Sequence, residues 1–173
     1  ELIRNDLKKN HPNKNIKYAL QENPLGIAHA LKQAENFVEK DSKILFILGD
    51  NFFGENPILN INLDDNFDAF LFLKPVTNPR EFGVANIIND KIKIIEEKPK
   101  KPQSNLAVLG LYLYSDNCFE LIERLDFSAR GELEITDLNN LFIKYSNVSF
   151  KTLDTWWIDA GTEERIEELK KLI

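Results

Sequence analysis

The amino-acid sequence predicts an α/β fold: a mostly parallel β-sheet with helices on both faces and an inserted β-hairpin layer. Helical apolar periodicity over residues 26–38 precedes a continuous apolar run at 44–48, the pattern of a helix followed by a buried strand. Residues 84–95 alternate around Asn89-Asp90 as hairpins do. A chain of 173 residues with 43% hydrophobic content can form one sizeable core, so we expect a single domain over residues 1–173.

The remaining elements follow from the same periodicities and from turn and capping residues. Helices are predicted, in chain order, at 2–11, 26–38, 117–125, 135–145 and after Thr162, whose hydroxyl can cap the last helix. Strands are predicted at 16–20, 44–48, 67–73, 84–88, 92–95, 106–114 and 148–153. The loop at 98–104 is too short to separate two domains.

Composition excludes several classes of function. A net charge of −6 argues against a nucleic-acid or membrane-surface partner, because phosphate-rich surfaces attract basic faces. The single cysteine, Cys118, allows no intrachain disulfide, and its neighbours indicate an ordinary buried thiol. No apolar run is long enough to span a bilayer, and the charged residues 1–9 are unlike a signal peptide. We therefore expect a cytoplasmic protein.

Two apolar segments end in an aspartate within two residues of a glycine. Residues 44–48 are followed by Gly49 and Asp50, and Trp157-Ile158 is followed by Asp159. Ligands of α/β sheets lie outside the carboxyl ends of the strands, so we expect both carboxylates on one rim. Such a pair suits Mg²⁺, which takes only one or two protein oxygens beside water and phosphate. Turn capping by Asp50 and a plain strand-to-helix turn at Asp159 are the alternatives.

Other polar positions fit a sugar phosphate and a base. Lys98 closes the hairpin as a point charge for phosphate, and Glu97 can accept hydrogen bonds from sugar hydroxyls. Read alone, an ordinary surface lysine is the commoner explanation. Gln21 offers an amide to a base edge, and Gly26 lets the backbone approach that base. The charged run 129–137 precedes a helix, and its acidic side chains also fit a purely structural role, which is to stabilise the N-terminal end of the helix dipole.

These segments form an ordered set of motifs that runs from about Ile16 to the last helix. The motifs are Gln21 with Pro24-Leu25-Gly26-Ile27-Ala28-His29-Ala30, Leu48-Gly49-Asp50-Asn51, Pro79-Arg80-Glu81-Phe82-Gly83-Val84, Glu96-Glu97-Lys98-Pro99, Arg130-Gly131-Glu132-Leu133-Glu134-Ile135-Thr136-Asp137 and Trp157-Ile158-Asp159-Ala160-Gly161-Thr162. Together they resemble the glucose-1-phosphate thymidylyltransferase family of sugar nucleotidyltransferases. The resemblance implies a Rossmann-like, GT-A-like nucleotidyltransferase fold.

The resemblance also implies roles for individual residues. By it, Gln21 and Gly26 hold the pyrimidine base, Asp50 and Asp159 hold Mg²⁺, and Gly83, Glu97, Lys98 and Val108 line the glucose 1-phosphate site. Lys98, Asp50 and Asp159 would be the catalytic residues. The implied reaction is attack of the sugar phosphate on the α-phosphorus of dTTP, which yields dTDP-glucose and pyrophosphate without a protein nucleophile.

Two departures from the family pattern stand out. The family usually has threonine at the position of Ala160, a change from which we expect a small effect. The family also opens with a strand, a Gly-rich loop containing arginine and a downstream lysine, whereas the seven glycines here are all isolated. We therefore expect a domain incomplete at its N-terminus and inactive alone.

Two other interpretations stay open at this point. One is an enzyme that uses UTP in place of dTTP, because thymine and uracil differ by one methyl group. The other is a non-catalytic sugar-nucleotide-binding or scaffolding domain. The sequence also leaves open whether the protein is a homo-oligomer.

Overall fold

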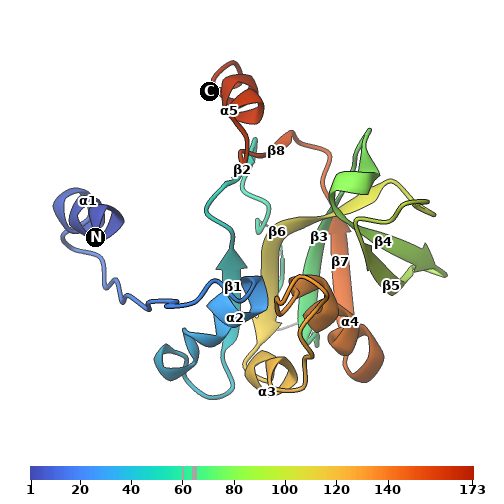
Figure 1. Ribbon diagram of the computed structural model, residues 1–173, viewed down its shortest axis with the longest axis horizontal. Helices are drawn as coiled ribbons and strands as arrows, with labels where there is room; N and C mark the ends of the chain where they lie inside the picture. Colours follow the sequence, from blue (N-terminus) through green and yellow to red (C-terminus); the bar gives the residue numbers. More distant parts are fainter. Residues whose placement is uncertain (60, 64–65) are drawn as a thin grey trace.

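The computed structural model describes residues 1–59, 61–63 and 66–173 and shows a six-stranded sheet beside a two-stranded sheet (Figure 1). The strands are β1 (Lys43–Ile47), β2 (Asn51–Phe53), β3 (Ala69–Pro75), β4 (Gly83–Ile88), β5 (Lys91–Glu97), β6 (Leu106–Ser115), β7 (Val148–Thr152) and β8 (Trp157–Asp159). The helices are α1 (Leu2–Asn10), α2 (Ile27–Lys32), α3 (Cys118–Ile122), α4 (Ile135–Tyr145) and α5 (Glu163–Leu169), with 3₁₀ turns η1 (Glu35–Phe37) and η2 (Pro79–Glu81).

The large sheet is mixed, which corrects the expected mostly parallel pairing. Its order is β5-β4-β6-β3-β7, and β1 also pairs with β6. Strand β6 is antiparallel to β1, β3 and β4, and β3–β7 is the parallel pair among the described residues. Strands β1, β3 and β7 consequently share one direction while β6 runs against them. A continuous apolar run indicates a strand that is buried on both faces. Central strands of parallel and antiparallel sheets are both buried in this way, so the run does not reveal the direction of a strand relative to its neighbours.

The two faces of the sheet are covered differently. Side chains of β3 alternate, with Leu71 and Leu73 in one core and Phe72 in the other. Helices α2, α3 and α4 pack on the first face (Figure 1) and contribute Leu31, Phe119 and Phe142 to its core, among other residues. The second core is completed by partly buried hydrophobic side chains outside any helix, which are Phe53, Ile58, Ile61, Phe70 and Trp157. The helices that pack on the sheet among the described residues thus share one face, where two covered faces were expected.

The inserted hairpin is confirmed and follows from local sequence. Strands β4 and β5 pair in antiparallel register from Gly83↔Glu97 to Ile88↔Lys91. Asn89 and Asp90 join them with φ of 51° and 57°, which is the left-handed geometry of a two-residue hairpin turn. The hairpin extends the sheet beyond β6 and carries Glu97 to the rim where the chain leaves the sheet.

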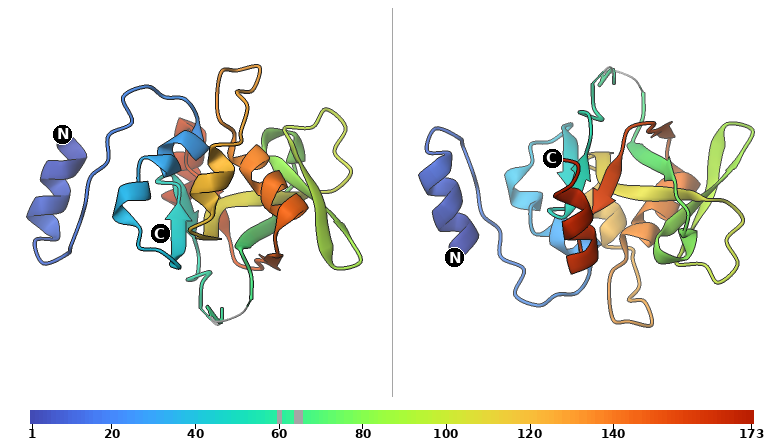
Figure 2. Two further views of the ribbon diagram at one scale, coloured as in Figure 1. Left: turned by 90° about the horizontal axis from the view of Figure 1, so that it is seen from below. Right: turned by 90° about the horizontal axis from the view of Figure 1, so that it is seen from above.

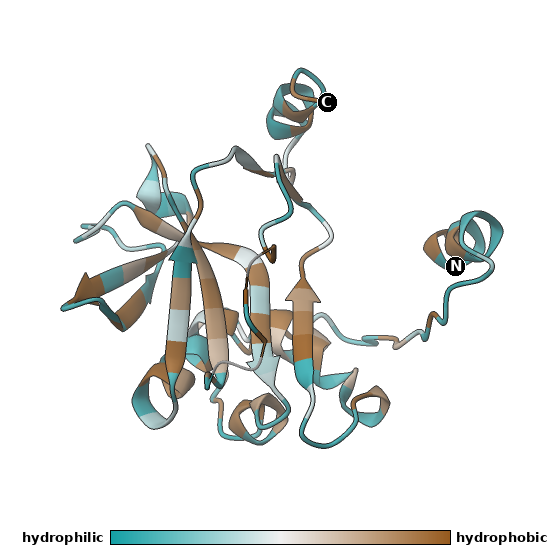
Figure 3. Ribbon diagram, turned by 180° about the vertical axis from the view of Figure 1, so that it is seen from behind, coloured by the Kyte–Doolittle hydropathy of each residue, from teal (hydrophilic) through white to brown (hydrophobic). Residues whose placement is uncertain are grey.

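The N-terminal segment lies apart from the sheet. Both views of Figure 2 place α1 at the end of an extended arm. The strand expected at 16–20 does not form, and Leu20 is 75% exposed. Strand β1 is apolar after Lys43 (Figure 3), and its Ile44 and Phe46 pack against the helix-covered core. Leu45 and Ile47 alternate with them and so point to the opposite face, where they are about half exposed. No described strand pairs with the second edge of β1. Alternating apolar residues form a strand only where a neighbour accepts their backbone hydrogen bonds.

Candidate active site

The two aspartates predicted to act as a pair lie together. Asp50 follows β1 through Leu48-Gly49, whereas Asp159 ends β8 in the small sheet, where it pairs in register with Asn51. The backbone N–H of Ala160 donates to the carbonyl oxygen of Asp50 at 2.7 Å. A β-carbon placed on Gly161 would lie 3.1 Å from Asp159 Oδ1 and 3.8 Å from Asp50 Oδ2. Both carboxylates therefore border one point, although Asp159 does not belong to the large sheet as expected.

Asn51 organises this junction, a role that the sequence analysis missed. Its Nδ2 donates to Asp50 Oδ1 at 2.9 Å, and its Oδ1 accepts from the Gly110 N–H at 3.0 Å and from Trp157 Nε1 at 2.7 Å. Asn51 is buried, so these hydrogen bonds satisfy a polar side chain that would otherwise be costly. The amide ties β6, the small sheet and Asp50 into one unit. Its position directly after Asp50 is the feature of the sequence that could have indicated this role.

The residues predicted to bind the sugar phosphate line one cavity of about 170 Å³. Gly83, Glu97, Lys98 and Val108 all border it, together with Asp159. The structure thus brings four positions from three strands and one loop around one cavity, together with one carboxylate of the pair, Asp159. The grouping was expected, while the binding role of each residue stays a prediction.

Glu97 is oriented by Thr136, a second residue that sequence reasoning left without a role. The Thr136 hydroxyl, at the start of α4, donates to Glu97 Oε2 at 2.6 Å. A β-carbon on Gly83 would lie 3.1 Å from Thr136 Oγ1 and 3.4 Å from Glu97 Oε2, so glycine makes room for this contact. One carboxylate oxygen of Glu97 is therefore engaged by Thr136, while the other, Oε1, lies 4.0 Å from Arg130 Nη2.

Lys98 leaves the hairpin in an unusual backbone conformation. Its φ is +43°, and its N–H donates to the carbonyl oxygen of Phe82 at 3.0 Å. A positive φ in a non-glycine residue costs free energy, and such residues occur in turns and cluster at active sites and ligand clamps. The conformation fixes where the Lys98 side chain leaves the backbone at the border of the cavity.

The predicted base-binding residues border a neighbouring cavity of about 390 Å³. Gln21, Gly26 and Glu132 line it, and Ile27 and Leu48 line both this cavity and the previous one. Gly26 has φ of 101°, and a β-carbon there would lie 2.5 Å from the Leu133 carbonyl oxygen. Glycine is therefore required by the close approach of this backbone, whatever binds in the cavity.

The amide of Gln21 is held in place by local contacts. Its Nε2 donates to the Gly26 carbonyl oxygen at 3.1 Å and lies 2.9 Å from His29 Nδ1. These contacts leave the amide oxygen as the group to meet a donor on a ligand. A base N–H is such a donor.

The charged run before α4 is largely internally paired. Arg130 Nη2 lies 2.8 Å from Glu134 Oε2 and 3.6 Å from Glu132 Oε2, and the pairing with Glu134 raises the pKa of Arg130. Burial, followed by the charges of Glu134 and Glu97, raises the pKa of Asp137. Glu132 and Glu134 thus face Arg130. Of the run 129–137, Ile135 and Thr136 line the sugar cavity, and Glu132 borders the neighbouring one.

Comparison with known proteins decides the family. The sequence model of the nucleotidyl transferase family matches residues 1–173. The chain belongs to the nucleotidyl transferase family. It is 37% identical over 164 residues to the glucose-1-phosphate thymidylyltransferase of Neisseria meningitidis, covering 91% of this chain and 57% of that protein. It is also 37% identical to the low-salt glycan biosynthesis nucleotidyltransferase of Haloferax volcanii, covering 91% of this chain and 45% of the relative. The chain therefore spans about half the length of these curated relatives.

Solved structures agree with this assignment. A Bacillus anthracis structure, assigned as a glucose-1-phosphate thymidylyltransferase and bound to sucrose, has a TM-score of 0.82 and 43% identity, covering 90% of this chain and 64% of that one. A UDP-glucose pyrophosphorylase in complex with UDP-glucose has a TM-score of 0.74 at 21% identity, covering 99% and 73%, which shows the shared fold. The resemblance inferred from the ordered motifs is confirmed, and so are the α/β class and the nucleotidyltransferase fold.

One departure from the family pattern has a structural explanation. Ala160 contacts Asp50 through its backbone N–H, a contact that does not need the threonine hydroxyl.

Within the described residues, no group of three or more His, Cys, Asp or Glu side chains is arranged to hold a metal ion. No described helix combines the length and apolarity that crossing a membrane requires.

Proposed function

We propose that this nucleotidyl transferase chain carries the sugar-phosphate, base and metal sites of an enzyme that joins glucose 1-phosphate to dTTP. The observation that carries the proposal is the meeting of Asp50 and Asp159 beside a cavity lined by Gly83, Glu97 and Lys98. The choice of glucose 1-phosphate and dTTP is supported by the glucose-1-phosphate thymidylyltransferases among the relatives.

The two carboxylates fit a Mg²⁺ ion. Asp50 Oδ2 and Asp159 Oδ1 border the same point, and hard oxygen donors of this number are typical where substrate phosphates and water complete the coordination. When bound, Mg²⁺ would neutralise charge on the reacting phosphates. Asn51 holds Asp50 in place for this purpose, through its 2.9 Å hydrogen bond.

The remaining residues position the substrates. Lys98 would pair with the phosphate of the sugar, and Glu97 would accept hydrogen bonds from its hydroxyls while Thr136 fixes the carboxylate. Gln21 would accept the pyrimidine N–H through its amide oxygen. A phosphate oxygen of the sugar then forms a bond to the α-phosphorus of the nucleotide, and the bond from that phosphorus to the bridging oxygen breaks to release pyrophosphate. Positioning and charge neutralisation supply the catalysis, so no protein nucleophile is required.

Binding of glucose 1-phosphate to this chain tests the sugar-phosphate site. We expect Lys98→Ala to weaken binding by about tenfold, since a charge-assisted contact to phosphate contributes on the order of 1.5 kcal/mol at an exposed position. Lys100→Ala is the matched control, because Lys100 is also exposed and lies two residues along the same loop but does not line the cavity. Calorimetric titration measures both. Equal affinities of the two variants would reject the role of Lys98.

Turnover separates the rival functions. With the protein expressed from its complete reading frame, we expect Mg²⁺-dependent release of pyrophosphate from dTTP and glucose 1-phosphate, lost on Asp159→Asn. A higher kcat/KM with UTP would identify the alternative nucleotide, which differs by one methyl group and about 1–3 kcal/mol of discrimination. Sugar-nucleotide binding without any pyrophosphate release would identify a non-catalytic binding domain.

A further inference from the structure

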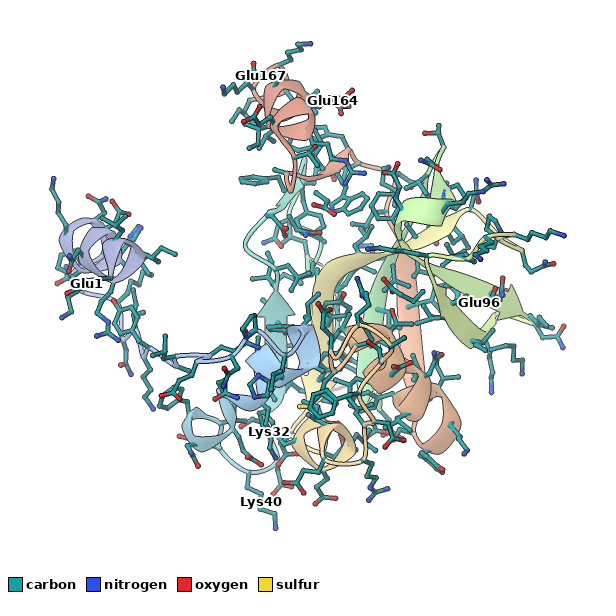
Figure 4. The ribbon with its side chains drawn as sticks, viewed as in Figure 1. Glu1, Lys32, Lys40, Glu96, Glu164 and Glu167 are labelled. Atoms are coloured by element: carbon teal, nitrogen blue, oxygen red, sulfur yellow. The ribbon has the colours of Figure 1, made fainter. Side chains whose placement is uncertain are left out.

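Arg165 occupies a position for which neither the motifs nor the proposed reaction accounts. It lies on α5, which stands above the small sheet (Figure 4, with Glu164 and Glu167 labelled on the same helix). Arg165 borders a third cavity, of about 310 Å³. Four residues line both this cavity and the sugar cavity, namely Glu81, Phe82, Trp157 and Asp159. Arg165 therefore faces the predicted active site across a shared wall.

The guanidinium group of Arg165 is held from three sides. Nη1 lies 3.4 Å from Asp159 Oδ2, and Nη2 donates to Glu81 Oε2 at 2.5 Å. The group also lies over the Phe82 ring, 5.2 Å from its centroid, and Phe82 packs edge-on against Trp157. A planar cation that pairs with two carboxylates and stacks on a ring loses freedom in each contact, so its location is well defined.

The pair between Arg165 and Asp159 is partly shielded from water. The two side chains are 26% and 30% exposed, which makes their attraction stronger than that of a fully solvated pair and weaker than that of a buried one. The other oxygen of Asp159 accepts from the Gly161 N–H at 3.1 Å. Both oxygens of Asp159 therefore have a donor or a cation beside them.

We propose that Arg165 is the internal counter-cation of Asp159 and lowers the affinity of the carboxylate pair for a divalent cation by competing with it. This inference rests on the proposed metal role of Asp50 and Asp159. A divalent cation on Asp159 removes the attraction that holds Arg165, and the guanidinium then keeps Glu81 as its partner. Glu81 ends η2 and itself lines the sugar cavity, so an Arg165 released from Asp159 stays at the rim of that cavity.

Mn²⁺ titration of this chain, with free Mn²⁺ measured by electron paramagnetic resonance, tests the competition. We expect Arg165→Met to tighten Mn²⁺ binding by about two- to fivefold, the range of a partly exposed ion pair. Arg130→Met is the control, because it also removes one partly exposed arginine, whose carboxylate partners are Glu97, Glu132 and Glu134. Unchanged or weaker binding in Arg165→Met, or an equal gain in Arg130→Met, would overturn the proposal.

A measurement on the unsubstituted chain does not depend on the fold of a variant. We expect Mg²⁺ to shift the ¹⁵Nε–Hε resonance of Arg165, and we expect the shift to vanish in Asp159→Asn. An unmoved resonance at Mg²⁺ concentrations that saturate the chain would contradict the role of Arg165. If Asp159→Asn instead leaves Mn²⁺ affinity unchanged, the metal role itself fails, so the two failures are distinguishable.

Discussion

Replacing Gly26 with alanine tests the close approach between the loop before α2 and the segment before α4. Gly26 has φ of 101° and ψ of 171°, a region that costs a side chain about 1–3 kcal/mol. The new β-carbon would also lie 2.5 Å from the carbonyl oxygen and 2.8 Å from the nitrogen of Leu133. Both are backbone atoms, so the segments must move apart.

Two hydrogen bonds depend on that approach. Leu133 N–H donates to the Leu25 carbonyl oxygen at 2.8 Å, and Ala28 N–H donates to the Leu133 carbonyl oxygen at 3.2 Å. Each contributes about 1 kcal/mol. Alanine also restricts the unfolded chain, which offsets the loss by about 0.4–1 kcal/mol. We therefore expect Gly26→Ala to lower the free energy of unfolding by about 2–5 kcal/mol.

Gly131→Ala is the matched control for this measurement. Gly131 also has a positive φ, of 74°, but a β-carbon there would have no atom within 4 Å. Its cost is therefore the conformational one alone, about 1–2 kcal/mol, less the same offset of about 0.4–1 kcal/mol from the restricted unfolded chain. Urea unfolding followed by tryptophan fluorescence and circular dichroism gives both values. If the two variants lose equal stability, the contact with Leu133 is not what requires glycine at position 26.

Two further predictions concern buried side chains of the core. The Tyr114 hydroxyl donates to Asn139 Oδ1 at 2.6 Å with both residues buried, so Tyr114→Phe should lower the free energy of unfolding by about 1–3 kcal/mol. The exposed control, Tyr145→Phe, should change it by less than about 0.5 kcal/mol in the same urea titration, and equal effects would contradict the reasoning. Burial raises the pKa of the Cys118 thiol to about 12 from 9.0, so the unfolded thiol loses its proton first as pH rises above 9. The free energy of unfolding should then fall by up to about 1.4 kcal/mol per pH unit, and Cys118→Ala should make this fall shallower between pH 9 and 10. The raised pKa values of Tyr112 and Tyr114 account for any slope that remains in the variant. A slope unchanged by Cys118→Ala would refute this prediction.

Elements governed by neighbouring residues were predictable from the sequence. The hairpin turn at Asn89-Asp90 has the positive φ values that these residues tolerate, and helix α4 begins and ends where its periodicity placed it. Thr162 caps α5 by accepting from the Arg165 N–H at 3.4 Å. The ordered motifs likewise indicated the family, because each motif is a short local pattern. Local backbone preference and side-chain capping act within a few residues, so they are visible without a structure.

Tertiary structure decided what depends on pairing between distant segments. Periodicity reports which side chains are buried but not the direction of the neighbouring strand, so the antiparallel course of β6 was not visible. The segment at 16–20 shows the converse, since its alternation forms no strand without a partner.

The site shows the same division between sequence and structure. The sequence by itself determined that Asp50 and Asp159 each follow an apolar segment, whereas pairing of β2 with β8 decided that they meet. Arg165 had no signal in the sequence, because its partner Glu81 is 84 residues away. Contacts of that range form only when burial of the whole core compensates the conformational entropy lost in closing the chain between them, and no short pattern encodes that balance.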